Sequence, residues 1–191
     1  MYSIQIGRAN KLWALTRILS NMTDDDQTIV FCNTKRMVDL SVQKLSKSGL
    51  EVGGLHGDLS QNQRERILQS FKDGTIKIII ATDVAARGID VDGITYVVNY
   101  DIPDDMDSFI HRVGRTGRIG RKGQAWSLVS KSDSGQLARI VATYGLTISQ
   151  VDVPELPKGT DREIITYKDD FMESADVLSL IHISEPTRRT P

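Results

Sequence analysis

The chain has 191 residues, enough for one domain with a substantial core. Apolar residues make up 39% of it and charged residues 26%, as is typical of globular proteins, and no run of about 18 apolar residues could cross a membrane. The formal net charge of −1 argues against a globally basic nucleic-acid binder, so any contact with RNA must come from a local group of residues.

The first half of the chain alternates between helical and extended patterns. In chain order, the expected elements are a helix at residues 10–21, a strand at 28–32, a helix at 35–48, a short strand at 51–55, a helix from 60 to 74 and a strand at 76–81. Apolar residues recur three and four positions apart in the helices. Ser60 and Gln63 form a capping-box pattern. The strand runs at 28–32 and 76–81 are continuously apolar, as expected of strands buried on both faces.

The second half continues this alternation and then loses it. We expect a strand at residues 94–100, a short helix at 107–113, a strand at 123–129 and a helix capped by Asp133 and Gln136. Beyond about residue 157 no apolar period remains. Strands that alternate with helices of about 12 residues predict an α/β fold, a three-layer sandwich in which helices cover both faces of a central parallel sheet.

The last segment, residues 178–191, differs from the rest in another way. It resembles the peptide that results when a common sequencing adapter is translated in frame. We therefore expect the native sequence to end near Val177 and interpret residues 178–191 as a non-native tail. An uninterrupted genomic reading frame through Pro191 would contradict this interpretation.

Cysteine use and the N-terminal residues indicate a compartment. The one cysteine, Cys32, cannot form a disulfide within the chain, and no Cys/His cluster offers a metal site. The first residues lack the basic start and the apolar stretch of a secretory signal. A reducing, cytoplasmic setting without a membrane partner is the expectation.

Polar and glycine-bearing segments follow the predicted strands. They are residues 33–35, 56–58, 82–83 and 100–101. In parallel sheets ligands bind beyond the carboxyl ends of the strands. This edge is therefore the expected working surface.

An arginine-glycine run occupies residues 112–123, with arginine at four positions three apart and glycine at four positions three apart. The run lacks the proline and the many repeats of collagen. A disordered arginine-glycine arm and a solvated basic loop remain alternatives, although the run lies between a predicted helix and a predicted strand. Guanidinium groups suit phosphate oxygens, and a loop rich in arginine can stabilise charge on a transferring γ-phosphate.

Residues 111–118, His-Arg-Val-Gly-Arg-Thr-Gly-Arg, resemble motif VI of the DEAD-box RNA helicases residue for residue. Related helicase groups usually begin this motif with Gln, so the histidine favours the DEAD-box branch. The remaining family motifs follow in order: residues 29–34 resemble motif IV, residues 55–58 and 61–64 the HG and QxxR elements, and residues 81–90 motif V. The resemblance covers about residues 4–153 and implies a RecA-like domain, the second of two in the family.

The resemblance implies a role for each residue near the nucleotide. Arg115 and Arg118 would be catalytic arginine fingers that reach ATP on a partner domain. Gly88 and Asp90 would line the nucleotide, with the carboxylate of Asp90 accepting hydrogen bonds from the ribose. His111 would couple motif VI to the other domain. The alternatives are structural salt bridges for the two arginines and a packed, structural role for the histidine.

The resemblance also implies RNA contacts at Thr34, Gly57, Arg64 and Thr82. Hydroxyl, backbone N–H and guanidinium groups can hold phosphates and 2′-hydroxyls without reading bases, so the expected binding is independent of sequence. Lys35 could add a phosphate contact, although a lysine at the start of a helix is more often simply solvated.

Two elements of a complete ATPase are absent from the sequence. It contains neither a Gly-x-x-x-x-Gly-Lys-Ser/Thr loop nor an Asp-Glu-Ala-Asp string. In the family both lie on an N-terminal RecA-like domain, which we expect to act in cis and to hold most of ATP and its Mg²⁺. A helicase that acts on DNA, and a domain that binds RNA or a partner without catalysis, are the alternatives.

The sequence thus predicts the C-terminal half of an ATP-dependent DEAD-box RNA helicase that unwinds short duplexes or remodels RNA–protein complexes. Residues 1–9 are interpreted as the remnant of an interdomain linker, residues 10–153 as the RecA-like domain, and residues 154–177 as an extension. Arg112 is left between a ligand contact and a purely structural role.

Overall fold

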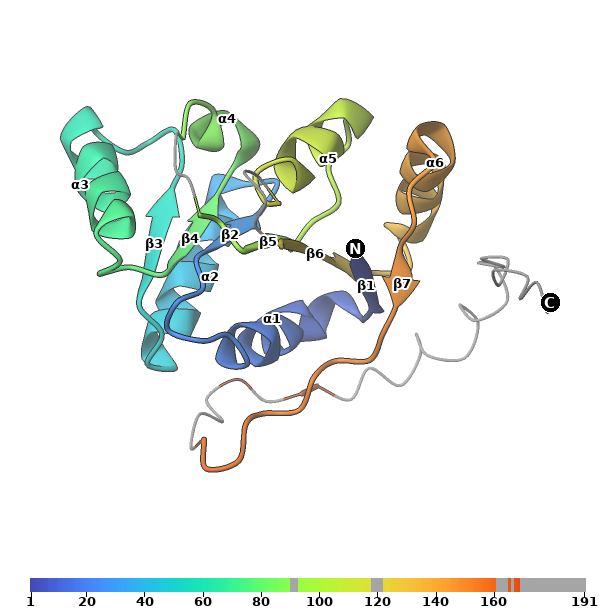
Figure 1. Ribbon diagram of the computed structural model, residues 1–191, viewed down its shortest axis with the longest axis horizontal. Coiled ribbons are helices and arrows are strands. Elements are labelled where there is room, and N and C mark those ends of the chain that lie inside the picture. The colour runs from blue at the N-terminus through green and yellow to red at the C-terminus, as the bar shows by residue number, and fades with distance from the viewer. Residues whose placement is uncertain (90–92, 118–121, 161–164, 166, 169–191) are drawn as a thin grey trace.

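The computed structural model of the chain describes residues 1–89, 93–117, 122–160, 165 and 167–168 (Figure 1). The elements are β1 (Tyr2–Gln5), the 3-10 helix η1 (Arg8–Asn10), α1 (Lys11–Ser20), β2 (Thr28–Phe31), α2 (Lys35–Lys47), β3 (Val52–Leu55), α3 (Gln61–Lys72), β4 (Ile78–Ala81), α4 (Asp83–Ala86), β5 (Tyr96–Asn99), α5 (Met106–Val113), β6 (Gln124–Val129), α6 (Ser134–Tyr144) and β7 (Ser149–Gln150). Within the described residues the strands form a seven-stranded sheet in the order β3-β4-β2-β5-β6-β1-β7. Neighbouring strands run parallel throughout. None of the described helices is long and apolar enough to cross a membrane.

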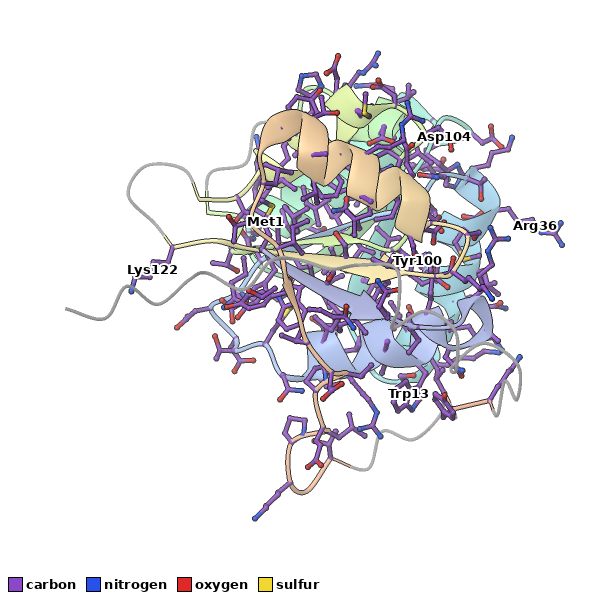
Figure 2. All side chains as sticks on the ribbon, turned by 90° about the vertical axis from the view of Figure 1, so that its right-hand side faces the viewer. Met1, Trp13, Arg36, Tyr100, Asp104 and Lys122 are labelled. Carbon is purple, nitrogen blue, oxygen red and sulfur yellow. The ribbon has the colours of Figure 1, made fainter. Side chains whose placement is uncertain are left out.

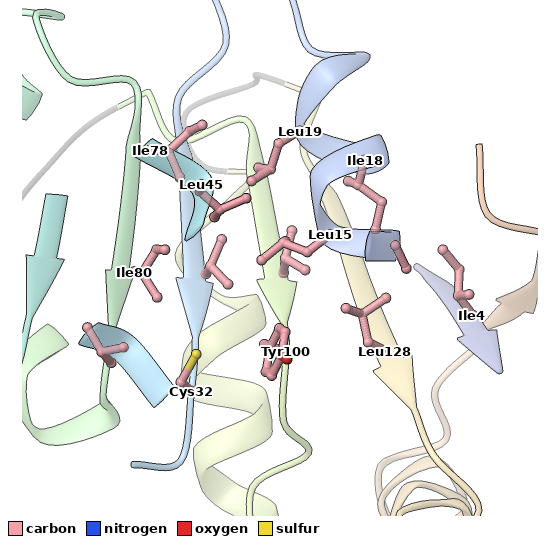
Figure 3. Packing of buried hydrophobic residues seen from close by; sticks show 14 residues of the cluster. Ile4, Leu15, Ile18, Leu19, Cys32, Leu45, Ile78, Ile80, Tyr100 and Leu128 are labelled. Atoms are coloured by element: carbon pink, nitrogen blue, oxygen red, sulfur yellow. The ribbon is translucent and has the colours of Figure 1, made fainter. Parts of the chain in front are cut away.

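Helices cover both faces of this sheet, as the sequence predicts. Helices α1 and α2 lie on one face, where Leu15 packs against a layer of strand side chains that includes Ile80 (Figure 3). Helices α3 to α6 lie on the other face, where Phe71 of α3 packs in the same cluster as Ile79. Because Ile79 and Ile80 are neighbours in β4 and enter opposite layers, a strand in this position must be apolar at every residue.

The first strand departs from the expectation for residues 1–9. Residues 2–5 form β1, which pairs in parallel with β6 on one side and with β7 on the other. A run of four residues that includes Ser3 carries too little pattern to distinguish a strand from an extended linker. Pairing with β6 decides the conformation, so residues 2–5 belong to the sheet. The other domain boundaries stay predictions.

Asp133 is the N-cap residue of α6, as predicted, but the predicted side-chain cap is wrong. In the described part of the chain the carboxylate of Asp133 does not cap the helix; it accepts hydrogen bonds from the backbone and the hydroxyl of Ser130 and, at 2.8 Å, from Lys11 Nζ. The Gln136 side chain donates to the carbonyl of Asp104 at 2.8 Å. A buried ammonium group is very unfavourable without a paired carboxylate, whereas water can satisfy the N–H groups at a helix N-terminus. The side chain of Asp133 therefore binds Lys11.

Beyond β7 the chain returns along α1, and we call residues 151–160 together with 165, 167 and 168 the C-terminal strap (Figure 1). The amide of Asn10, which is buried, donates to the carbonyl of Lys168 at 2.8 Å and accepts from its N–H at 2.7 Å. The ring of Tyr167 meets Trp13 edge-on at 5.0 Å, and Figure 2 places Trp13 beside this part of the strap. Hydrogen bonds to its backbone, one ring contact and three apolar side chains packed against the core, Val151, Val153 and Ile165, hold the strap. These apolar residues do not recur at a regular helical or strand spacing, so the sequence shows no apolar period.

We predict that a chain ending at Val153 is less stable than one ending at Val177. The shorter chain loses both hydrogen bonds between Asn10 and Lys168, which together contribute about 1–3 kcal/mol to the free energy of unfolding. It also loses the contact between Trp13 and Tyr167. Urea denaturation followed by circular dichroism measures the difference. Equal unfolding midpoints for the two chains would show that the strap contributes nothing to stability.

Candidate functional site

The loops that follow the central strands meet at one edge of the sheet because all the strands are parallel. The helix after β2, α2, lies on the face of α1, whereas the helices after the neighbouring strands β4 and β5 lie on the opposite face. Such a change of direction opens a crevice beyond the strand ends, which is where ligands bind in open α/β sheets. In this chain a buried side chain of the protein itself lies beside the ends of these strands.

That side chain is Arg112 of α5, which is only 1% exposed. Its Nε and Nη2 atoms each donate to the carboxylate of Asp83 at 2.6 Å. Nη2 also donates to the side chain of Asn33 at 2.9 Å, and Nη1 donates to the carbonyl of Asp101 at 2.6 Å. Asn33 follows β2, Asp83 follows β4 and Asp101 follows β5. One guanidinium therefore ties three strand ends to α5.

The energetics of this arrangement depend on complete pairing. Removing a guanidinium from water is expensive, and only close, well-directed hydrogen bonds offset that cost. The two-pronged contact with Asp83 and the side-chain and carbonyl oxygens around it meet this requirement. Of the two roles left open for Arg112, the geometry therefore supports the structural one. A signal was present in the sequence, since Arg112 follows Phe109 by three residues and both lie on the buried side of α5.

A second buried cation, Lys11, extends this network to α1 and α6. Its Nζ atom donates to the carbonyl of Tyr100 at 2.9 Å and to Asp133 at 2.8 Å, and it lies 3.8 Å from a carboxylate oxygen of Asp101. Burial acts to raise the pKa of Asp133, but hydrogen bonds from Lys11 and Ser130 outweigh it and hold the pKa below its ordinary value. Asp101 thus lies between the two buried cations, and sequence reasoning missed Lys11 and its pairing with Asp133.

The residues expected near a nucleotide gather between α4 and α5. His111 is exposed, and Arg115 is half-buried and donates to the carbonyl of Ile89 at 3.0 Å. Both line a small pocket of about 80 Å³, together with Arg87. Gly88 is exposed nearby with φ at +74°, a conformation that favours glycine. The exposure of His111 contradicts the packed, structural alternative for this residue.

The arginine-glycine run is anchored to the domain at both of its ends. The hydroxyl of Thr116 donates to the carbonyl of Ile94 at 2.8 Å. A Cβ atom on Gly123 would collide with Thr116 and with the backbone of Gly117, so only glycine permits this close approach. Residues 112–117 therefore belong to the folded domain and not to a disordered arm. Arg118, like Asp90, lies outside the described residues.

Three of the residues expected to contact RNA lie on loops of the same edge, and the fourth, Arg64, lies in α3. Thr34 and Gly57 are exposed, and the backbone N–H of Thr82 donates to the carbonyl of Leu55 at the end of β3. Arg64 of α3 donates to the carbonyl of Ala85 at 2.5 Å and, through a second nitrogen, to that of the residue two positions further on. The guanidinium of Arg64 thus fastens α4 and its C-terminal cap to α3, and its further N–H groups are not used by these two bonds.

Two polar contacts join the start of α2 to the loop after β3, and we call them the α2–β3 clamp. Lys35 Nζ lies 2.7 Å from Asp58 Oδ2, and His56 Nε2 lies 2.8 Å from Asp39 Oδ1. The hydrogen bond from Lys35 lowers the pKa of Asp58 below its ordinary value and raises the pKa of Lys35. The clamp lies beside Thr34 and Gly57, which directly adjoin Lys35 and Asp58. Sequence reasoning did not predict these pairings.

Comparison with known proteins identifies the domain. Residues 10–120 match the family described as helicase conserved C-terminal domain. The C-terminal domain of the DEAD-box protein Dbp5 superposes with a TM-score of 0.74 at 37% identity, over 80% of this chain and 89% of that one. The chain is a DEAD-box helicase C-terminal domain.

Further relatives of this DEAD-box domain are longer proteins. The DEAD-box ATP-dependent RNA helicase CshA of Bacillus cereus is 41% identical over 160 residues, which are 84% of this chain and 30% of that protein. A structure described as S. cerevisiae Dbp5 bound to RNA and ADP BeF3 superposes with a TM-score of 0.73 at 36% identity, over 80% of this chain and 41% of that one. The chain spans about a third of the length of the curated relatives it matches.

The comparisons confirm the predicted family and the RecA-like fold of the DEAD-box domain. Its arginine-glycine run divides into a buried hub, Arg112, and the more accessible Arg115. Among the described residues no group of three or more His, Cys, Asp or Glu side chains is placed to hold a metal ion. The individual site residues, Arg115 and Gly88 among them, stay predictions.

We predict that Asp83→Ala destabilises this DEAD-box domain by about 3–5 kcal/mol, the usual cost of leaving a buried charge without its partner. The substitution removes both 2.6 Å contacts from a guanidinium that water cannot reach. Urea denaturation measures the loss. Asp58→Ala is the matched control, because it removes one carboxylate from an exposed ion pair and should change the midpoint little. Similar midpoints for the two variants would contradict the role assigned to Arg112.

Proposed function

We propose that this domain supplies the arginine side of an ATP site and one half of an RNA-binding groove in an ATP-dependent DEAD-box RNA helicase. The observation that carries the proposal is the gathering of His111, Arg115 and Gly88 on one edge of the sheet, in a chain of this family. The same chain contains no phosphate-binding loop of its own. A nucleotide on this edge would therefore be shared with another domain.

The chemistry of this edge fits part of a nucleotide. Guanidinium groups such as those of Arg115 and Arg87 suit phosphate oxygens, and the pocket they line has room for only a fraction of ATP at about 80 Å³. We assign Arg115 and Arg118 as the fingers, and Gly88 and Asp90 as contacts to the sugar and phosphates. ATP with its Mg²⁺ would be held mainly by an N-terminal RecA-like domain in cis. The S. cerevisiae Dbp5 structure bound to RNA and ADP BeF3 supports this assignment by relationship.

The proposed RNA groove consists of Thr34, Gly57, Arg64 and Thr82. Their segments adjoin one another, since Thr82 is hydrogen-bonded to the end of β3 and Arg64 of α3 holds α4, which begins directly after Thr82. These groups would contact phosphates and 2′-hydroxyls and read no bases. Such binding needs few cations, which agrees with a formal net charge of −1.

The hub supports coupling between the two proposed sites. On the RNA side, Thr82 directly precedes Asp83, whose carboxylate pairs with Arg112. On the nucleotide side, His111 directly precedes Arg112. RNA and ATP would together close two domains across a cleft, and the closed form would bend one strand out of a short duplex or remodel an RNA–protein complex. Hydrolysis would reopen the cleft and release the RNA.

We predict that the purified chain hydrolyses no ATP above background, with or without RNA, because it has no loop to hold the triphosphate and magnesium. Phosphate release is the measurement. RNA-stimulated release by the chain alone would overturn the division of the site between two domains.

A second prediction concerns the longer protein, whose frame can be sought in the source DNA upstream of Met1. A frame with the phosphate-binding loop and the Asp-Glu-Ala-Asp string supports catalysis, whereas its absence favours a domain that binds RNA without hydrolysing ATP. In that longer protein we expect Arg118→Ala to lower single-turnover ATP hydrolysis by about 10³–10⁵-fold while ATP affinity changes little. Arg115→Ala should act in the same direction.

The control is Arg139→Ala, which removes an exposed arginine from α6, away from the proposed fingers. It should leave both hydrolysis and ATP affinity unchanged. Hydrolysis at the normal rate by Arg118→Ala would refute the assignment of this residue as a finger.

A further inference from the structure

One cation on the proposed RNA edge is paired with a carboxylate of the domain itself. Lys35 directly follows Thr34, and its Nζ atom lies 2.7 Å from Oδ2 of Asp58, which directly follows Gly57. The two side chains are 60% and 59% exposed. The pair therefore spans the space between two of the positions proposed to hold the RNA backbone, and solvent reaches both of its members.

We propose that Lys35 binds an RNA phosphate, and that Asp58 occupies its ammonium group until RNA displaces the carboxylate. This inference rests on the proposed function, because it assumes that RNA lies along Thr34 and Gly57. It adds to that function an autoinhibitory contact: every phosphate that reaches Lys35 must first compete with Asp58.

The exchange is chemically balanced. A lysine ammonium is a compact point charge that binds phosphate as readily as carboxylate, so one charge-assisted hydrogen bond replaces another. An exposed ion pair is weak in water and is screened by salt, so opening it is easy. The released carboxylate of Asp58 can turn into solvent, where water hydrates it.

The second half of the clamp keeps the loop in place during this exchange. The backbone N–H of Asp58 donates to His56 Nδ1 at 3.3 Å, and His56 Nε2 lies 2.8 Å from Asp39 Oδ1. Since Nδ1 accepts a hydrogen bond, Nε2 carries the proton and donates it to Asp39. The main chain beside Gly57 is thus fixed by His56, whose side chain is 9% exposed, and does not depend on the contact between Lys35 and Asp58.

The contact also sets a threshold for binding. With Asp58 in place, Lys35 attracts a stray phosphate only weakly, because the neighbouring negative charge repels it. RNA held at the same time by the neighbouring loops brings a phosphate to Lys35 at high local concentration and can win the exchange. The domain would therefore distinguish an RNA strand from free phosphate without any base contact.

The test measures the binding of a fluorescein-labelled, single-stranded oligouridylate to the chain by anisotropy at several KCl concentrations. We expect Asp58→Asn to bind about two- to fivefold more tightly, since Lys35 is then free of its competitor. The slope of log K against log [KCl] should become steeper by about 0.7 in Asp58→Asn. In the unchanged chain, the K⁺ released from the phosphate that Lys35 neutralises is offset by K⁺ that the freed carboxylate of Asp58 attracts, whereas the variant has no such carboxylate. Lys35→Met should weaken binding and flatten the plot.

Two controls separate this exchange from a general effect of charge. Asp104→Asn makes the same change in net charge at another exposed carboxylate and should affect binding less. In the Lys35→Met background, Asp58→Asn should have no further effect, whereas simple repulsion by Asp58 would persist there. Equal effects of Asp58→Asn with and without Lys35, or equal effects of Asp58→Asn and Asp104→Asn, would overturn the proposal.

A measurement without RNA tests the pair itself. Titration of the Asp58 carboxyl by NMR should give a higher pKa in Lys35→Met than in the unchanged chain, because the hydrogen bond that lowers it is lost. An unchanged pKa would mean that the pair does not form in solution and would overturn the proposal.

If the unchanged chain and every variant fail to bind the oligouridylate, the RNA groove and the role of Lys35 both fall. If RNA binds but Asp58→Asn has no effect, only the role of Lys35 falls.

Discussion

The guanidinium of Arg112 is buried at the point of the sheet where the helices that follow neighbouring strands change from one face to the other. A buried cation is tolerated only when its donors are paired. That requirement fixes the ends of β2, β4 and β5 relative to one another, because each of them supplies an oxygen to the same group. It also fixes the rotation of α5 about its axis, because Arg112 can point inward only when His111 points outward. The burial of Arg112 thus determines which way the accessible residues of motif VI point.

A common frame of this kind explains how two proposed sites can act together. Thr82, on the RNA side, directly follows β4; Asp83, the first residue of α4, pairs with Arg112, and the end of α4 leads to Gly88 on the nucleotide side. Displacement of any one loop would break contacts that the others share, so these residues should move as one body. Lys11 and Asp133 extend the frame to α1 and α6 through a further buried ion pair. The rigid part of the edge is therefore built from paired charges, whereas the exposed pair of Lys35 and Asp58 is free to exchange partners.

The opposite side of the domain is held together differently. There α1 is covered by the sheet on one side and by the C-terminal strap on the other, and the contacts to the strap are amide–backbone hydrogen bonds, one aromatic pair and a few apolar side chains such as Ile165. The hydrogen bonds reach the backbone of the strap and do not depend on its side chains. This accounts for a segment that packs well and yet has no helical or strand period in its sequence.

Elements whose pattern is local could be predicted from the amino-acid sequence. Residues 28–32 and 76–81 could be predicted as buried strands because a continuous apolar run leaves no face for water, and Ser60 with Gln63 could be predicted as a cap because both of its hydrogen bonds lie within one turn. A motif of eight residues was enough to name the family. Contacts within the folded domain were needed to establish that residues 2–5 form a strand, that Arg112 is a hub, and that the side chain of Asp133 binds Lys11 and does not cap α6. In each of these cases the deciding partner is brought in from far along the chain, as Asp83 is to Arg112 across 29 residues, and a local pattern carries no information about such a partner.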